Sequence, residues 1–514
     1  MASTSGGTSS RRQALTRFAV AVATMVAASG LAVDSVSANT ASGSAAGVPL
    51  TDGSMYNVVD QIGARALWQQ GITGRGVNVA VIDTGVVPTP ALSGADKVVA
   101  MVDLSGEGSD DSLVYGDTYG HGTHMAGIIA GRDPGANPAT AASRPDWFLG
   151  VAPDAGIVSV KVAGSSGAVD VTQVIAGIDW TIENAAELGI RVINLSYASG
   201  STLDYIGDPL SFAVERAWRA GIVVVVAAGN DGRNEFELGM PAQNPYVIAV
   251  AAAERKSNGG WATPMWASSG DGVRNPDVSA PGRSIVSLRA AGSTIDAQHP
   301  TGYVSQYLFK GSGSSQAAAV VSGAAALLIS ARPQLTPDQV KALLASTADR
   351  NAIVPRDERK SGQGLIAVSR ANSTPPTAAV QTWPASVGNG SLDAARGGQY
   401  VALDGVVLQG EVAFNGSRWV GSRWVGSRWV DAVWNGSRWV DGTWMGSRWV
   451  GSRWVGSRWV GAAWEGSRWV GSRWVGSTWT SATWTGSRWV DVSWDGSRWV
   501  DTSWGGSRWV GAGW

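Results

Sequence analysis

Six short runs of β-branched and other apolar residues, separated by helical patterns, constrain the fold of this chain more than any other feature. They cover residues 77–83, 98–102, 157–162, 192–196, 222–228 and 247–252. Between them, residues 171–188 and 209–220 carry apolar side chains at three- and four-residue spacing, which is typical of amphipathic helices. Strands alternating with helices predict βαβ units, and therefore an α/β fold with a mostly parallel sheet and helices on both faces.

Functional groups of such sheets collect at the carboxyl ends of the strands, and two polar residues stand there. The first run ends in Asp83, and the run at 222–228 is followed by Gly229 and Asn230. An asparagine after a strand and a glycine is commonly a turn residue. Its side-chain amide would otherwise be a good hydrogen-bond donor into a site at the edge of the sheet. Both interpretations stay open on these residues alone.

A third polar residue, Ser315, stands where small, flexible residues give way to an apolar run. Residues 311–323 are GSGSSQAAAVVSG, and residues 324–329 are wholly apolar, which predicts a tight turn leading into a buried helix. Unpaired N–H groups and the helix dipole stabilise negative charge at a helix N-terminus. Ser315 is therefore a candidate nucleophile for acyl transfer. The alternative is that Ser314 or Ser315 only caps a core helix.

The chain has three histidines, so any histidine-dependent catalysis must use one of them. His121 lies between two glycines in the segment GHGTHMAGIIAG at 120–131, and these glycines let the backbone come close to whatever the imidazole contacts. We expect His124 to be structural, and nothing in the sequence supports a role for His299. His121 is therefore the candidate base.

Composition excludes several classes of function. The 514 residues carry 39 Lys and Arg against 40 Asp and Glu, so overall charge does not favour nucleic acid as a partner. The absence of cysteine excludes disulfides, thiolate catalysis and zinc–thiolate sites.

Three of these segments resemble the Asp, His and Ser signatures of the subtilisin-like serine endopeptidases, peptidase family S8. They are VIDTG at 81–85, HGTHMAG at 121–127 and GSSQAA at 313–318, in that family's order. Four secondary signatures agree: GVAP at 150–153, INLS at 193–196, AAGN at 227–230 and SAPG at 279–282. Seven matches in order across residues 55–370 leave little room for the interpretation that Ser315 is only a cap.

The resemblance implies a serine endopeptidase that hydrolyses peptide bonds through an acyl-enzyme on Ser315. His121 would act as general acid and base, and Asp83 would orient its imidazole. The Asn230 amide and the Ser315 backbone N–H would form the oxyanion hole. The competing hypothesis is a surface attachment protein with an inactive protease-like domain, but the intact Asp83, His121, Ser315 and Asn230 argue against it.

The resemblance also implies a set of substrate-binding residues, which are Ser196, Tyr197, Ala198, Ala228 and Gly229. The family most often has Ser-Leu-Gly where this chain has Ser-Tyr-Ala, and we expect the Ala198 methyl to narrow the primary specificity pocket. Another departure is Ala319, where the family usually has proline. No cofactor is expected for the chemistry. Structural calcium is expected by family analogy only, because no compact oxygen-ligand loop can be named.

The sequence divides into five predicted segments. Residues 1–38 resemble a signal peptide, with a basic start, an apolar stretch at 18–33 and the cleavage motif Val-Ser-Ala at 36–38. A flexible lead-in at 39–55, a peptidase domain at 56–372 and a linker with short strands at 373–415 follow. The apolar stretch is too short and alanine-rich for a membrane span. We therefore expect export by the Sec or twin-arginine route, an extracellular or cell-wall location and no transmembrane helix in the mature protein.

The last segment, residues 416–514, repeats the pentapeptide Gly-Ser-Arg-Trp-Val with variants. Tryptophan recurs every five residues from Trp419 to Trp514. Five is neither a helical nor a strand period, so a turn-rich repeat such as a spiral or solenoid fits better than one amphipathic element. Three interpretations stay open: a self-associating or disordered stalk, a binder of cell-wall glycans, and a binder of membrane interfaces or anionic polymers.

Overall fold

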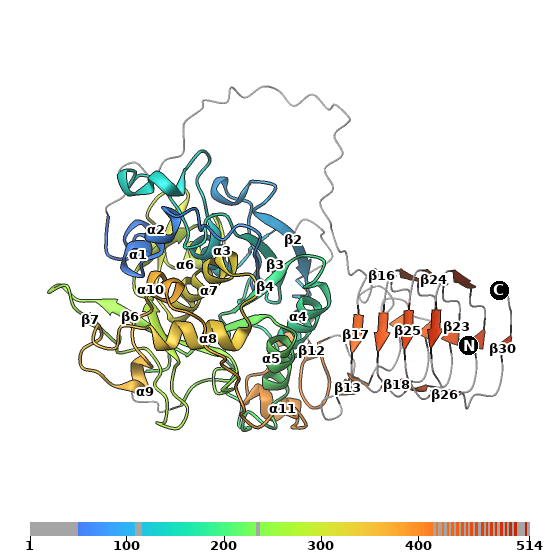
Figure 1. Cartoon of the computed structure of the whole chain (residues 1–514). Coiled ribbons are helices and arrows are strands. Elements are labelled where there is room, and N and C mark those ends of the chain that lie inside the picture. The colour runs from blue at the N-terminus through green and yellow to red at the C-terminus, as the bar shows by residue number, and fades with distance from the viewer. Residues whose placement is uncertain are drawn as a thin grey trace, which may run out of the picture. The chain divides into compact units, whose positions relative to one another are not determined.

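A computed structural model of the chain describes residues 50–107, 116–232, 237–403 and 406–414, together with short strands between residues 418 and 510 (Figure 1). The predicted signal peptide and most of the predicted lead-in lie outside the described residues. The chain divides into two compact units. The described part of the first comprises residues 50–390 and 394–401, and the second comprises residues 391–393 and those from 402 onward.

The first unit is built on an eight-stranded sheet with the order β2-β3-β1-β4-β5-β6-β7, in which β8 also pairs with β6. All of these pairs are parallel except β6 with β7. The strands are β1 (Asn78–Asp83), β2 (Val98–Asp103), β3 (Gly156–Lys161), β4 (Ile190–Leu195), β5 (Val223–Ala227), β6 (Ile248–Arg255), β7 (Trp261–Ala262) and β8 (Val278–Pro281). A separate antiparallel pair joins β9 (Ile285–Leu288) to β10 (Leu308–Gly311). The six predicted runs correspond to β1–β6.

Helices cover both faces of the sheet, as predicted. Ser322 of α7 (Ser314–Ala331) donates to Asn194 of β4, whose register partner on β1 is Val81. A Cβ added at Gly177 of α4 (Val171–Asn184) would instead lie 3.2 Å from the side chain of Ile82. Because neighbouring residues of a strand point to opposite faces, α7 and α4 lie on opposite sides of the sheet.

Side-chain caps define where several helices begin. Asp170 begins α4 with a capping box, Asp208 caps α5 (Pro209–Arg219), and Thr336 caps α8 (Pro337–Ser346) with a second capping box. The remaining helices of this unit are α1 (Met55–Gln61), α2 (Ala64–Trp68), α3 (His121–Ala130), α6 (Thr294–Gln298), α9 (Glu358–Ser361) and α10 (Val368–Ser373), with 3₁₀ turns at Pro90–Leu92, Pro138–Ser143 and Pro300–Gly302.

The central helix α7 is the core of this unit. Within the described ranges it is long and apolar enough to cross a membrane, yet 89% of it is buried inside the protein. It packs across β4, β5, β6 and β8 and against α3. Burial on all sides explains why its sequence is apolar throughout and not amphipathic.

Within the predicted linker at 373–415, residues 373–390 and 394–401 belong to the first unit. Backbone hydrogen bonds join these residues to the rest of that unit, from the Val387 N–H to the Ile206 carbonyl and from the Thr202 N–H to the Ala394 carbonyl. One helix, α11 (Leu392–Arg396), follows, and the short strands β11 (Ala402–Leu403) and β12 (Val406–Val407) pair antiparallel.

In the repeat segment, the described strands are two or three residues long. After the antiparallel pair β13 (Arg418–Trp419) and β14 (Trp424–Val425), each pairing is parallel and joins residues twenty positions apart. One series runs through Trp429, Trp449, Trp469, Trp489 and Trp509. A twenty-residue spacing corresponds to four pentapeptides.

Candidate active site

Asp83 and His121 are 38 residues apart in sequence and are brought together by the end of β1 and the start of α3. His121 Nδ1 lies 2.8 Å from Asp83 Oδ1 and 2.9 Å from Oδ2. The Asp83 carboxylate is 4% exposed and also accepts from the Thr84 N–H at 2.8 Å. The close approach needs Gly122, because a Cβ there would lie 2.2 Å from the Gly85 carbonyl oxygen.

The charge around His121 favours a basic imidazole. Burial by itself lowers the pKa of His121, but the carboxylate of Asp83, helped by that of Asp117, outweighs it, so the net pKa is raised. A carboxylate held at Nδ1 keeps the proton on that nitrogen. Nε2 is then left as the acceptor that a general base needs.

Ser315 is the second residue of α7, in the first turn, whose backbone N–H groups have no partner within the helix. The residue is 8% exposed, and α7 packs against α3, which begins at His121. The start of the core helix thus brings the serine to the side of the sheet where the histidine helix begins.

Asn230 follows β5 and Gly229. The backbone of Gly229 has a φ of 117°, which favours glycine, and the side chain of Asn230 is exposed. Its Oδ1 accepts from the Ser314 N–H at 2.8 Å and from the Ser314 hydroxyl at 3.1 Å. Since the amide oxygen is occupied, the Nδ2 group is the end that remains to donate to a ligand. Glycine is needed at 313, because a Cβ there would lie 2.8 Å from the side-chain oxygen of Gln316.

The sequence signature of the subtilase family, Peptidase S8, matches residues 74–390. The chain belongs to the subtilase family. Serine protease AprX of Bacillus subtilis (strain 168) is 36% identical over 318 residues, which cover 60% of this chain and 68% of AprX. Subtilisin DY of Bacillus licheniformis is 35% identical over 312 residues, covering 59% of this chain and 93% of that protein.

Among solved structures, Sphericase is 28% identical with a TM-score of 0.47, and the match covers 58% of this chain and 92% of the Sphericase chain.

As a subtilase, this chain is a serine endopeptidase, and its substrates are proteins or peptides.

One of the predicted substrate-binding residues of this subtilase, Ser196, contacts the backbone of Ser315. The Ser196 hydroxyl donates to the Ser315 carbonyl at 3.4 Å and accepts from Asn194 at 3.2 Å. A Cβ added at Gly239 would lie only 2.7 Å from the Ala198 Cβ, so the two segments are in close contact there, next to the isolated bridge between Ser199 and Met240. Tyr197 lies between Ser196 and Ala198 and is partly buried. Ala228 and Gly229 are both buried, and the Ala228 N–H donates to the Val250 carbonyl at 3.0 Å.

Asp117 is a site residue that the sequence reasoning missed. Its carboxylate accepts from the Gly120 N–H at 2.6 Å, the Thr84 hydroxyl at 2.7 Å and the Thr123 N–H at 2.7 Å. Burial raises the pKa of Asp117, and these hydrogen bonds oppose that rise. Gly120, the N-cap of α3, has no side chain to cap the helix. An acid four residues before His121 was therefore the available signal, because a helix N-terminus needs an acceptor.

The remaining histidines are His124, which we expected to be structural, and His299, for which the sequence supports no role. His124 is buried within α3, and burial lowers its pKa to about 3, so its imidazole is neutral. His299 is the exposed residue that follows α6. Across the described parts of the chain, no group of three or more His, Asp or Glu side chains is placed to hold a metal ion. No step of the chemistry below uses one, and calcium stays an expectation.

Proposed function

We propose that this subtilase cleaves peptide bonds through an acyl-enzyme on Ser315, with His121 as general acid and base and Asp83 as its orienting group. Ser315 Oγ would attack the scissile carbonyl carbon while His121 Nε2 takes the hydroxyl proton. His121 would return that proton to the leaving amine as the C–N bond breaks, and water would then hydrolyse the ester by the same route. Asp83 stays ionised and stabilises the imidazolium.

The observation that carries this proposal is the position of His121 Nδ1 against both oxygens of a buried Asp83 carboxylate. Such a carboxylate fixes the orientation of the His121 ring and the nitrogen that carries its proton. It is what a general base needs, since it sets the tautomer and stabilises the cation that forms.

The oxyanion of the tetrahedral intermediate would be held by the Asn230 Nδ2 group and the Ser315 backbone N–H. Occupation of Asn230 Oδ1 by Ser314 supports this assignment, because it leaves the donor end of the amide for the substrate. The residues Ser196, Tyr197 and Ala198 would hold the substrate backbone in extended form, as an added β-strand.

Labelling with a fluorophosphonate probe tests the nucleophile. The full chain should form a covalent adduct on Ser315 that mass spectrometry locates, and Ser315→Ala should form none. Ser314→Ala is the matched control and should still be labelled. An adduct elsewhere, or no adduct on a folded protein, would overturn the assignment.

We further propose that the enzyme is exported and that residues 416–514 hold it at the cell surface. The signal-like residues 1–38 support export, and a relative that is 31% identical over 308 residues, covering 60% of this chain and 40% of its own length, is named minor extracellular protease Epr of Bacillus subtilis (strain 168). Rows of indole and guanidinium groups suit contact with glycans or polymer surfaces.

Deletion of residues 416–514 tests the second proposal. It should release the enzyme from the cell surface into the medium while peptidase activity is kept. Equal retention of the full and the shortened enzyme would contradict an anchoring role.

A further inference from the structure

The last residues of the family match and part of the chain that follows it lie on the peptidase unit. The match ends at residue 390, and α10 ends at Ser373. We call residues 374–390 and 394–401 the C-terminal strap; both belong to the compact peptidase unit. At the start of the strap, the Arg332 guanidinium donates to the carbonyl of Thr374 at 2.9 Å and to that of Ala371 at 3.0 Å. The strap is therefore tied down where it begins.

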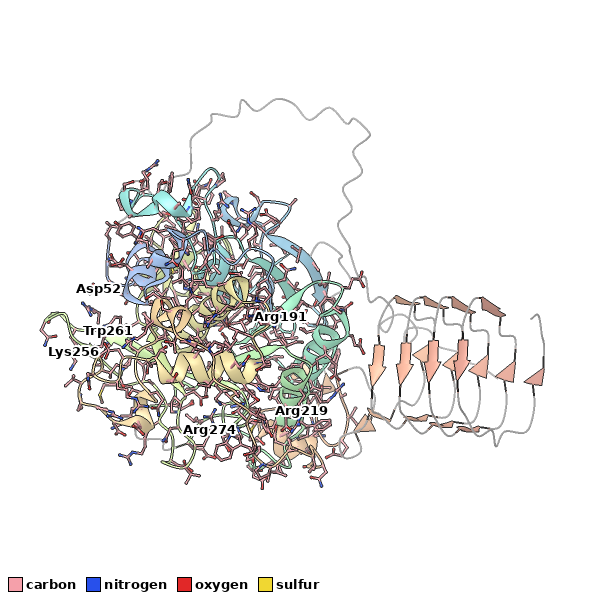
Figure 2. The ribbon with its side chains drawn as sticks, viewed as in Figure 1. Asp52, Arg191, Arg219, Lys256, Trp261 and Arg274 are labelled. Atoms are coloured by element: carbon pink, nitrogen blue, oxygen red, sulfur yellow. The ribbon has the colours of Figure 1, made fainter. Side chains whose placement is uncertain are left out.

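Hydrogen bonds continue along the strap toward the substrate side. Gln381 bonds to Asp338 on α8, and the Ser386 N–H donates to Glu215 on α5 at 2.8 Å. Glu215 also binds Arg219 at 2.7 Å, and Figure 2 labels this arginine. The Val387 N–H then donates to the Ile206 carbonyl at 2.7 Å. The strap thus runs from the C-terminal helices to the loop at 199–208, which follows the predicted substrate residues.

The strap ends in a fully buried ion pair. Arg396 Nε donates to Asp170 Oδ2 at 2.6 Å, and the two side chains are 1% and 0% exposed. Asp170 is also the N-cap of α4, and its Oδ1 accepts from the Thr172 N–H at 3.0 Å. A buried pair adds little net stability compared with an apolar pair, but loss of one partner is strongly destabilising because it leaves a buried charge unpaired. The value of such a pair is that it specifies one arrangement of the groups around it.

The strap contacts the residues that follow the predicted substrate-binding residues. There is no room for a Cβ at Gly397 of the strap, because it would meet the carbonyl oxygen of Gly200, two residues after Ala198. Burial, together with the carboxylates of Asp170 and Asp208, raises the pKa of the Tyr197 hydroxyl, and the charge of Arg396 opposes that rise. The loop beyond is held as well, because the Thr202 N–H donates to the Ala394 carbonyl of the strap at 3.0 Å.

We propose that Arg396 is a positioning residue for the substrate-binding residues Ser196, Tyr197 and Ala198, so that the C-terminal strap forms part of the peptide-binding side of the enzyme. One end of this segment is fixed by the bond from Ser196 to the Ser315 carbonyl, and the strap fixes the other. The inference rests on the proposed function, in which these residues hold the substrate backbone. Loss of the Arg396–Asp170 ion pair should weaken binding of an extended peptide without altering Asp83, His121 and Ser315.

The test uses the full chain and two substrates, a peptide with four residues before the scissile bond and a single-residue ester. Arg396→Met should raise KM for the peptide about tenfold, with kcat for the ester and the rate of fluorophosphonate labelling changed by less than about twofold. Arg396→Lys, which keeps the charge, should recover part of the loss. Arg332→Met is the matched control at the far end of the strap and should lower thermal stability without raising KM.

A second variant separates positioning from folding. Asp170→Asn combined with Arg396→Met keeps a helix cap and removes the unpaired buried charge, so the melting temperature should recover while KM for the peptide stays high. The double variant also carries the test if Arg396→Met does not fold. Recovery of KM together with stability, equal effects on both substrates, or an unchanged peptide KM would overturn the inference.

Failure of the proposed function gives a different result from failure of the strap inference. If the wild-type chain forms no adduct on Ser315, the proposed chemistry is wrong. If it is labelled normally and Arg396→Met binds the peptide as the wild type does, only the role of the strap is wrong.

Discussion

Ser314 occupies the oxygen of the Asn230 side chain, through its N–H at 2.8 Å and its hydroxyl at 3.1 Å. The same hydroxyl accepts from the Gly229 N–H at 3.1 Å. The residue before the nucleophile therefore connects the start of α7 to the end of β5. This connection holds the Asn230 amide with its donor end toward the substrate side, where a developing oxyanion needs it.

Replacing Asn230 with alanine should lower kcat about 10²- to 10³-fold with KM little changed. This is the range for loss of one oxyanion-hole donor, for which the corresponding asparagine of subtilisin is the standard example. Steady-state kinetics on a peptide amide measure it. Ser314→Ala should have a smaller effect, because its backbone N–H still reaches Asn230. An unchanged kcat in Asn230→Ala would show that the amide does not contact the oxyanion.

Replacing Asp117 with asparagine should move the acidic limb of kcat/KM to lower pH. Asp117 helps to raise the pKa of His121, and only the neutral imidazole can take the serine proton. Loss of this charge should lower the His121 pKa, so the midpoint of the acidic limb should lie at lower pH than in the wild type. A pH profile measures the shift, and the exposed Asp52→Asn is the control. A fall in activity at every pH with no shift would mean that Asp117 acts on geometry alone.

His124 should make the fold sensitive to acid. Its folded pKa is lowered to about 3 by burial, so below the ordinary value near 6.5 the unfolded chain binds a proton that the folded chain does not. This contribution to stability is present above pH 6.5 and is lost as pH falls toward 3. The slope from one proton is at most about 1.4 kcal/mol per pH unit.

Urea unfolding of a Ser315→Ala chain at pH 6, 5 and 4 should therefore show a steeper loss of stability than His124→Asn in the same background. His299→Asn is the matched control, because His299 is exposed, and it should leave the slope unchanged. Identical slopes for all three proteins would contradict the neutral state of His124.

Gly122→Ala should damage the active site more than its size suggests. The new Cβ would lie 2.2 Å from the Gly85 carbonyl oxygen and 3.2 Å from the Asp83 Cβ, so α3 must move away from β1. Overpacking of this kind typically costs about 1–3 kcal/mol, and a displacement near 1 Å can lower the rate about 10²-fold. Gly207→Ala is the control, since its Cβ would meet nothing closer than 3.5 Å. Thermal unfolding and the rate of fluorophosphonate labelling measure both effects.

Local patterns were sufficient for most of the fold. The β-branched runs became β1–β6, and Thr336 caps α8 with proline at its first position, a pattern that is typical of helix starts. The site residues could be named from local features: Asp83 ends an apolar run, His121 lies between two glycines, and Ser315 stands where an apolar run begins. Asp117 was missed because its role depends on Thr84, which is 33 residues away.

The packing of the C-terminal strap on the peptidase unit could not be predicted from local sequence patterns. Proline and glycine at 375–390 are typical of a linker, and composition carries no information about a surface that receives the chain. Arg396 meets Asp170 across 226 residues of sequence, and a buried pair at that distance has no local signature.

By itself, the sequence determined the order of strands and helices, the family signatures and the residues able to carry the chemistry, because periodicity and glycine placement are local properties of the chain. Only the tertiary structure decided that Asp83 faces His121, that Ser314 orients Asn230 and that Arg396 closes on Asp170. These contacts join residues 38, 84 and 226 positions apart. They form only when the sheet register and the packing of helices on its two faces bring distant segments together.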